Sequence, residues 1–432
     1  MKAGFARLDV TPPNGTCIAS KYFYFVPAKG FLEPLEVNAL AVADEERTVV
    51  MLAADFAGIT QKYMDIFRER IVQRTGLSVE NVCITALHQH TSVVVSDPTE
   101  TDTPVCDPVV LEWWYRKFCD VAEMALADLQ EATLRVGARE TAEQISFIRR
   151  NEKVEDSNAP DGYRYVSFGP EADNTVYLAR FVREGAKDIA LVNFGTHPVV
   201  VGGPYFSNDW PGAVRRFVEK DIADVHCMLI NGFQGDVNHF NYYTATSAQR
   251  RSMKGHGHAE YMGRVIANAV VALWENTVPV ACDRVESKAE ILYTKTRTDG
   301  EERYKEAREL CEAYEKDHST ANAKTLAEAQ RIVEIRHAAP IYQRIPMTLI
   351  EIGGLVIVGI GAEPFTAYAT GARAILRDRF VMTACLMNGY ECYMPTKEAF
   401  QKKDYAVGRS RFTPALQEEA MEMIKKLAAC ER

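Results

Sequence analysis

Short apolar runs alternate with amphipathic helical patterns through most of the chain. The runs NVCITAL, IALVNFGT, CMLI, LVIVGIGA and MTACLMNG have the length and composition of buried β-strands. Apolar positions at helical spacing predict helices over about 61–75, 108–132, 211–222, 256–275 and 365–379. This alternation predicts an α/β fold with a mixed β-sheet core flanked by helices.

The segment 300–338 differs from the rest because it is rich in charged residues and helical in period. A break at 317–320 (DHST) predicts two antiparallel helices, which form either a surface excursion or an oligomer contact. No fixed-period repeat, low-complexity tract or Pro/Gly/Ser linker marks a domain boundary. We therefore expect one large catalytic domain over 1–432, with 300–338 as a helical insertion.

Composition and charge exclude several classes of protein. The 432 residues include 50 Lys or Arg against 59 Asp or Glu, and this net charge of −9 argues against a nucleic-acid binder. Apolar residues at 47% and charged residues at 25% are typical of a globular protein and exclude disorder. No run is long enough to predict a transmembrane helix, and the start MKAGFARLDVTPP does not read as a signal peptide. The ten cysteines form no C-x2-C pair, which favours a cytoplasmic protein.

Each of the five strand-like runs is followed by polar side chains that could bind a ligand. In order along the chain these are His88 and His90, His197, the segment 231–236 (NGFQGD), Glu363, and the pair Tyr390 and Tyr393. The carboxyl ends of central strands are where α/β proteins gather ligands. We therefore expect the functional site at these strand ends.

Each candidate also has a structural interpretation. His88 and His90 share a face of an extended segment and could bind one metal, or one could cap a loop while the other is exposed. His197 could be a ligand or a core histidine. Glu363 follows an apolar run, where burying a charge is costly without a cation or a donor, but a glutamate also suits a first helical turn.

Three further positions are weaker candidates. Asp209 and Asp236 could be turn residues or helix caps, although the glycines around Asp236 would let backbone N–H groups approach a ligand. His256 and His258 open a helix, where capping or packing is the favoured interpretation. The chain has no G-x-S-x-G and no H-E-x-x-H motif, so serine hydrolases of the α/β class and zincins lose their main support.

Taken together, two histidines and a glutamate follow three separate strands. This is the ligand set of a catalytic zinc site that keeps one position open for water. The sequence therefore predicts a Zn²⁺ site that contains His88, His197 and Glu363.

Seven motifs carry a resemblance to a known family. They are GFARLDVTPP, ITALHQHTS, FIRRNEK with a later DGYRYV, FGTHPVVVGGPYFSNDWPG, NGFQGDVN, GIGAEPF and NGYECYMPTKEAFQKKDYAVG, in this order between residue 1 and about 410. The chain in this respect resembles the neutral (non-lysosomal) ceramidases and their bacterial homologues.

The resemblance implies roles for particular residues. Zinc would be held by His88, His197, Glu363 and Tyr393, of which Tyr393 is implied by the resemblance alone. His90 would lie beside the metal and handle substrate or a proton. Tyr405 would face the reacting carbonyl, and Arg149 or Arg150 would lie near the substrate.

The chain departs from the family pattern in two respects. The family's GD-x-S segment carries a serine treated as catalytic, and GDVNHF places Asn238 there. An amide cannot act as an acyl-accepting nucleophile, but it can donate to an oxyanion. Larger members continue into a C-terminal β-sandwich, which we do not expect here.

The resulting hypothesis is a zinc-dependent hydrolase that cleaves an amide (N-acyl) bond with metal-activated water. His90, or Asp236 as second choice, would accept the water proton, and Tyr405 and Asn238 would donate to the oxyanion. The substrate would be a small-molecule or lipid-like N-acyl compound. The alternatives are a metal-binding homologue that binds a small metabolite without catalysis, or an esterase or carbohydrate N-deacylase on the same site.

Overall fold

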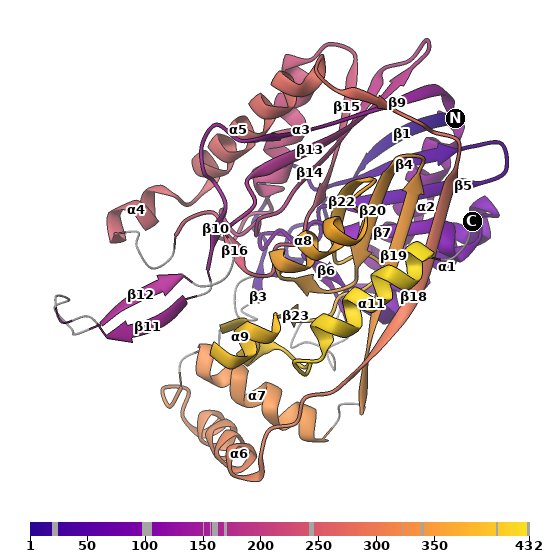
Figure 1. The fold of residues 1–432 in the computed structure, drawn as a ribbon. Coiled ribbons are helices and arrows are strands. Elements are labelled where there is room, and N and C mark those ends of the chain that lie inside the picture. The colour runs from indigo at the N-terminus through magenta and orange to yellow at the C-terminus, as the bar shows by residue number, and fades with distance from the viewer. Residues whose placement is uncertain are drawn as a thin grey trace.

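The computed structural model of the chain shows a mixed β-sheet core enclosed by helices (Figure 1). It describes residues 1–19, 25–96, 106–149, 151–155, 157, 163–167, 171–241, 246–321, 323–337, 341–402 and 405–429. The predicted α/β fold with a mixed sheet core is confirmed. Among the described residues, no helix combines the length and the apolarity needed to cross a membrane.

The larger sheet contains nine strands in the described part of the chain. Its order is β15–β14–β13–β9–β1–β4–β5–β7, with β17 paired to β9. The bounds are β1 Lys2–Asp9, β4 Glu36–Ala43, β5 Thr48–Ala54, β7 Val82–Ala86, β9 Gln130–Glu140, β13 Thr175–Arg183, β14 Asp188–Phe194, β15 Val225–Asn231 and β17 Val278–Val280. β14 runs parallel to β15 and β5 runs parallel to β7, so the sheet is mixed.

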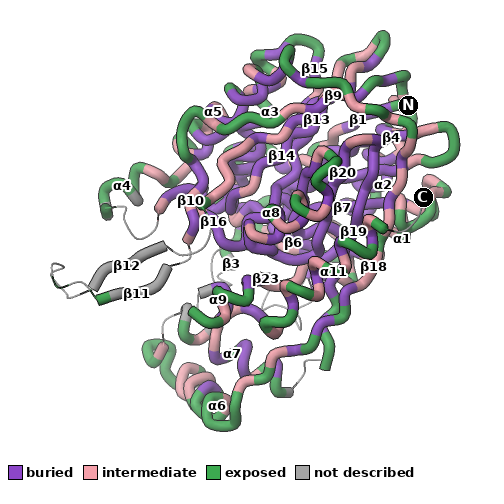
Figure 2. Tube along the Cα trace, viewed as in Figure 1, coloured by how far each residue is buried: buried purple, intermediate pink, exposed green. Residues whose placement is uncertain are grey.

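A second sheet has four strands among the described residues, in the order β18–β19–β20–β22. Their bounds are β18 Val285–Lys295, β19 Tyr342–Ile352, β20 Leu355–Ile360 and β22 Phe380–Cys385. One face of this sheet packs on the larger one, because Ile350, Ile357 and Met382 share a buried cluster with Leu40 and Met51. The two sheets therefore form the centre of the molecule, as the burial colours of Figure 2 show.

Helices cover the outer faces of both sheets. α1 (Gln61–Thr75) and α2 (Pro108–Ala127) pack over β1, β4, β5 and β7, and α8 (Thr366–Ile375) and α11 (Leu416–Ala429) pack over the smaller sheet. α3 (Asp209–Asp221) and α5 (His256–Trp274) pack on each other beside β13, β9 and β15. A Cβ added at Gly263 of α5 would lie 2.3 Å from the Cβ of Ala213, so this helix crossing requires glycine.

Four of the predicted helices match these elements to within a few residues, but the helix expected over 108–132 ends early. α2 stops at Ala127 and β9 begins at Gln130. Asp128 turns the chain here, since its carboxylate accepts hydrogen bonds from the backbone N–H of Phe5 (2.9 Å) and from Arg183. Both partners are distant in sequence, so helical periodicity alone could not place this end.

The segment 300–338 forms two helices, α6 (Glu301–Lys316) and α7 (Ala323–His337). The ion pair between Arg336 and Glu301 joins the end of one helix to the start of the other, as antiparallel packing requires. α7 also contacts α10 (Tyr405–Arg409), and Arg411 pairs with Glu334. The hairpin is thus a surface excursion that rests on the C-terminal part of the chain (Figure 1).

The remaining elements are short. They are β2 Cys17–Ala19, β3 Phe25–Pro27, β6 Gly58–Ile59, β8 Val94–Val95, β10 Phe147–Ile148, β11 Asn151–Glu155, β12 Tyr163–Ser167, β16 Val237–Asn238, β21 Glu363–Pro364, β23 Tyr393–Met394, α4 Ser247–Ser252, α9 Lys397–Lys402 and a 3₁₀ turn at Val79–Asn81.

β22 connects the smaller sheet to two strands of the larger one. Asn193 of β14 donates its side-chain amide to Thr383 O (2.8 Å) and accepts from Thr383 N (3.1 Å). Asn388, just after β22, donates from its backbone N to Ile84 O of β7 (2.7 Å) and accepts at Oδ1 from Ile84 N (2.9 Å). These contacts bring the carboxyl ends of β7, β14 and β20 to one place.

Candidate metal centre

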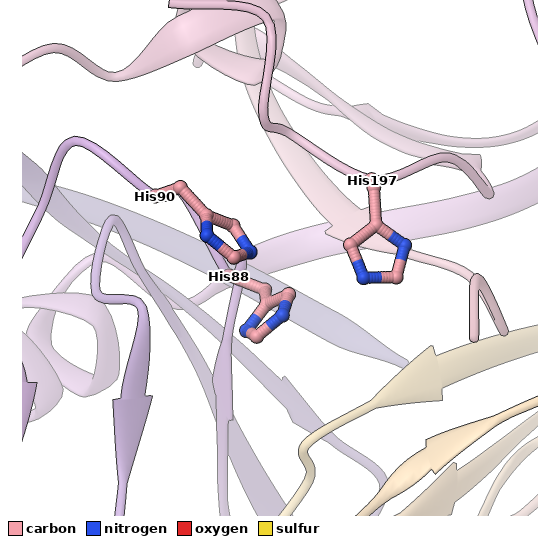
Figure 3. A group of neighbouring side chains, drawn as sticks. All are labelled: His88, His90 and His197. Carbon is pink, nitrogen blue, oxygen red and sulfur yellow. The ribbon is translucent and has the colours of Figure 1, made fainter. Parts of the chain in front are cut away.

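Three histidines predicted from the strand ends lie together in the structure. His88 and His90 follow β7, and His197 faces them from the segment after β14 (Figure 3). Each offers a ring nitrogen, and these nitrogens lie within 4.8 Å of one another. Glu363 of β21 completes the group, because its Oε2 lies 3.1 Å from Nε2 of His197 and 3.3 Å from Nε2 of His88.

Backbone geometry and second-sphere hydrogen bonds orient the two imidazoles. His88 has a left-handed φ of 73°, which turns the chain sharply after β7. Its Nδ1 lies 2.7 Å from Ala57 O, and Nδ1 of His197 lies 2.7 Å from Gln234 O. A carbonyl oxygen can only accept, so we assign the proton of each ring to Nδ1. Nε2 of each ring is then the atom that presents a lone pair, as in metal-binding histidines.

This assignment places two lone pairs and a carboxylate around one point. In the described part of the chain, Nε2 of His88 is buried and has no hydrogen-bond partner. Buried acceptors that face one another need a positive charge between them. Zinc bonds of about 2.0–2.1 Å to nitrogen and oxygen give tetrahedron edges of roughly 3.3–3.4 Å, close to the distances of 3.1 and 3.3 Å from Oε2 of Glu363 to the two imidazole nitrogens. The residues therefore fit a zinc ion.

Tyr393 lies at the same point. Its hydroxyl is 3.5 Å from Nε2 of His197, and β23, which it begins, pairs in parallel with β21 so that Tyr393 stands beside Glu363. All four residues expected to hold zinc are thus brought together by the fold.

The charges of the group follow from burial and proximity. Burial and the nearby charge of Arg149 lower the pKa of His197 to about 4, so this ring is neutral near pH 7. Burial acts to raise the pKa of Glu363, but the proximity of His88 and His197 outweighs it and holds that pKa well below its usual range. Burial acts to lower the pKa of His88, and the attraction of Glu363 outweighs this and raises it. An ionised Glu363 therefore draws positive charge to this point.

Arg149 lies beside the group. Its guanidinium stands 5.0 Å from the centre of the Tyr393 ring and donates to Gly235 O (2.7 Å). Arg150, the alternative to Arg149 as the arginine near the substrate, lies outside the described residues. Tyr405 begins α10, and its side chain also lies outside what the structure describes.

Asp236 and Asn238 occupy the loop after β15. Oδ1 of Asp236 accepts from Thr366 N (2.7 Å) and Oδ2 accepts from Thr366 Oγ1 (3.2 Å), so this carboxylate caps the start of α8. Asn238 belongs to β16 and pairs with Phe147 of β10. Its buried Oδ1 accepts no hydrogen bond from the residues that the structure describes.

The sequence analysis did not predict the buried contacts that support the two histidines after β7. Gln89, which lies between His88 and His90 in the sequence, donates its side-chain amide to Asp55 Oδ1 (2.7 Å). Asp55 is fully buried and is paired with Arg215, whose Nη2 lies 2.6 Å from Oδ2 of Asp55. The signal in the sequence was an acidic residue within the apolar run TVVMLAADFAG, where a charge requires a partner.

Comparison with known proteins supports the fold. No family model matches the sequence, and no curated protein matches it. The neutral ceramidase from Pseudomonas aeruginosa superposes with a TM-score of 0.74 at 15% sequence identity, covering 99% of this chain and 74% of that one. A ceramidase complexed with C2 gives a TM-score of 0.73 at the same identity and coverage. The fold is therefore neutral ceramidase-like, as the motifs predicted, and identity this low shows the fold alone.

Proposed function

We propose that this protein is a zinc-dependent hydrolase that cleaves an amide (N-acyl) bond with metal-activated water. The observation that carries the proposal is the position of Glu363, whose Oε2 lies 3.1 Å from Nε2 of His197 and 3.3 Å from Nε2 of His88. The three residues follow three separate strands. Tyr393 is the fourth proposed ligand. A bound zinc ion would lower the pKa of a water molecule and polarise the scissile carbonyl.

His90 is the proposed general base. Its ring nitrogen lies within 4.8 Å of those of His88 and His197, close enough to take a proton from water held there. Asp236 is the second choice, because both of its oxygens are engaged by Thr366. The base would then pass the proton to the leaving amine.

Other residues would bind and orient the substrate. Arg149 is the arginine that we propose to bind the substrate, since its guanidinium lies over the ring of Tyr393. Arg150 is the alternative residue for this role. Tyr405 and Asn238 would donate hydrogen bonds to the developing oxyanion. Because Asn238 has no hydroxyl, water and not a side chain is the proposed nucleophile.

The substrate class rests on the fold and the proposed site. Both solved structures named above are ceramidases, so we propose an N-acyl compound, small or lipid-like, as the substrate. The composition favours a cytoplasmic location. Asn238 also favours one competing function, a metal-binding homologue that binds a small metabolite and does not hydrolyse it. An ester or a carbohydrate N-acyl group on the same site is the other alternative.

The test compares metal content and hydrolysis in the wild type and in His197→Ala and Glu363→Ala. We expect each variant to hold one zinc fewer than the wild type by elemental mass spectrometry and to lose hydrolysis of an amide panel. His318→Ala, in the turn between α6 and α7, is the matched control and should change neither. Full metal content and full activity in His197→Ala would contradict the proposal. A metallated wild type that turns over no amide or ester would favour the ligand-binding alternative.

Competition separates the bond classes. If an amide is the substrate, an amide analogue should inhibit ester turnover at the same site, and His88→Ala should abolish both. Ester turnover that an amide analogue leaves unchanged would instead favour the esterase.

A further inference from the structure

A second group of potential metal ligands lies outside the candidate centre. His256 is the first residue of α5 and Glu260 follows it by one helical turn, so both side chains share a face. Glu33 reaches them from the segment before β4. Nε2 of His256 contacts Oε1 of Glu33 and lies 3.6 Å from Oε1 of Glu260. One ligand atom from each residue lies within 4.8 Å of the other two.

The carboxylate of Glu33 is the most informative member of this group. The residue is only 9% exposed, and its Oε2 accepts a hydrogen bond from Ser207 Oγ (2.7 Å). Its other oxygen, Oε1, is buried, and the contact that it makes in the described part of the chain is the one with Nε2 of His256. This oxygen points at the imidazole of His256. Burying a carboxylate is costly unless positive charge faces it.

The surrounding charges leave the group negative. Arg216 pairs with Glu260 and donates to Asn208 Oδ1 (3.1 Å), so one guanidinium balances one of the two carboxylates. With a neutral imidazole at His256, the remaining charge is that of Glu33. Either a proton on His256 or a metal ion would balance it.

We propose that Glu33, His256 and Glu260 form a second divalent metal site that takes an ion of the zinc class. One imidazole nitrogen and two carboxylate oxygens, with a position open for water, are a set that zinc accepts. Calcium and magnesium prefer oxygen ligands throughout, so the imidazole disfavours them. The sequence favoured capping or packing for this histidine, and its neighbour His258 does pack, with its ring stacked on Tyr261.

The site would join segments that also carry the candidate centre. Ser207, which donates to Glu33, pairs with Thr91 next to His90 through Ser207 N and Thr91 O (3.1 Å). Gly255, next to His256, donates to Val200 O (2.8 Å) in the segment that follows His197. A metal ion held here would therefore brace both histidine segments from outside the candidate centre.

The test is the zinc stoichiometry of chelator-treated protein on titration with Zn²⁺ alone. If both sites exist, the wild type binds about two zinc ions per chain, one at the candidate centre and one at this group. We expect His256→Ala and Glu33→Gln to bind one fewer. Glutamine at position 33 keeps an oxygen that can accept the hydrogen bond from Ser207 Oγ. Loss of zinc in Glu33→Gln would therefore not be explained by misfolding. His258→Ala, two residues along the same helix, is the matched control and should bind as many ions as the wild type.

Combination with His88→Ala separates this inference from the proposed function. His88→Ala should retain a zinc-dependent rise in melting temperature, and His88→Ala/His256→Ala should lose it. If His256→Ala binds as many ions as the wild type, the group is an ion pair and the inference is wrong. If His88→Ala binds as many as the wild type while His256→Ala binds fewer, this site stands and the candidate centre fails.

Discussion

His197 and Glu363 come from different sheets, and their Nε2 and Oε2 atoms lie 3.1 Å apart. His197 follows β14 of the larger sheet, whereas Glu363 follows β20 of the smaller one. The candidate centre is therefore also a joint between the two sheets. Changes that shift one sheet against the other should weaken metal binding before they unfold the protein.

Gly235→Ala tests this relationship directly. A Cβ at Gly235 would lie 2.4 Å from Glu363 O and 2.9 Å from Pro364 O, and backbone atoms cannot move aside as side chains do. The substitution should displace the loop that holds His197 through Gln234 O. Loss of such second-sphere support typically costs about 10–100-fold in metal affinity. Competition titration with a zinc chelator measures it.

Gly202→Ala is the matched control for this prediction. Gly202 lies in the segment that follows His197, and an added Cβ at Gly202 would meet no atom within 4 Å. It should bind zinc as the wild type does. Equal zinc affinity in the two variants would show that the contact between Gly235 and Glu363 does not support the site.

His90→Ala and Asp236→Asn separate the two candidates for the base. If His90 is the base, His90→Ala should lower kcat by about 10²–10⁴-fold while zinc content is retained. Asp236→Asn should keep amide turnover, and because an amide oxygen can still accept from Thr366 N, it should cost less than about 1 kcal/mol in the free energy of unfolding. Amide turnover and urea denaturation of both variants check this. The reverse pattern of kcat values would move the role to Asp236.

Arg215→Met should strongly destabilise the protein. Arg215 is 1% exposed and Asp55 is fully buried, so the substitution leaves a buried carboxylate without its partner. Breaking such a pair costs about 3–5 kcal/mol. Arg116→Met, which breaks an exposed pair with Glu112, should cost less than about 1 kcal/mol. Urea denaturation compares the two variants.

A second substitution tells pairing from packing in this buried network. Adding Asp55→Leu to Arg215→Met removes the unpaired charge and should recover part of the lost stability. No recovery would mean that the guanidinium stabilises the fold through its other contacts, such as the hydrogen bond from Nε to Glu36 (3.1 Å).

Asp209 should make stability depend on pH. Burial raises the pKa of its carboxyl to about 7 from 3.8, although Val200, Val201 and Trp210 donate backbone hydrogen bonds to it. A raised folded-state pKa gives stability that is complete below about pH 3.8 and lost as the pH rises through about 7. Relative to Asp209→Asn, the wild type should therefore lose stability across this window.

Denaturation of both proteins at several pH values between these limits measures the difference. Asparagine tolerates the left-handed φ of 49° at this position, so the backbone should be preserved. A difference in the free energy of unfolding that stays constant with pH would mean that Asp209 does not titrate in this range.

Local patterns in the sequence determined the fold class and the core of the candidate site. Apolar runs and helical periodicity identified β7, β14, β15, β20, β22 and most helices, because burial and period are visible in neighbouring residues. His88, His197 and Glu363 could be selected because each follows a buried strand, and the fold brings them together. Tyr393 came only from the resemblance to a family, and the roles of Tyr405 and Arg150 remain predictions.

Only the tertiary structure decided which of these residues meet. Asp236 could be a base or a cap, and its contact with Thr366, 130 residues away, shows that it caps α8. Asp128, which ends α2 early, is held by Arg183, and the pairing of Glu33 with His256 joins segments that share no local pattern. Periodicity records how each segment is buried, but it carries no information about which distant segment covers it.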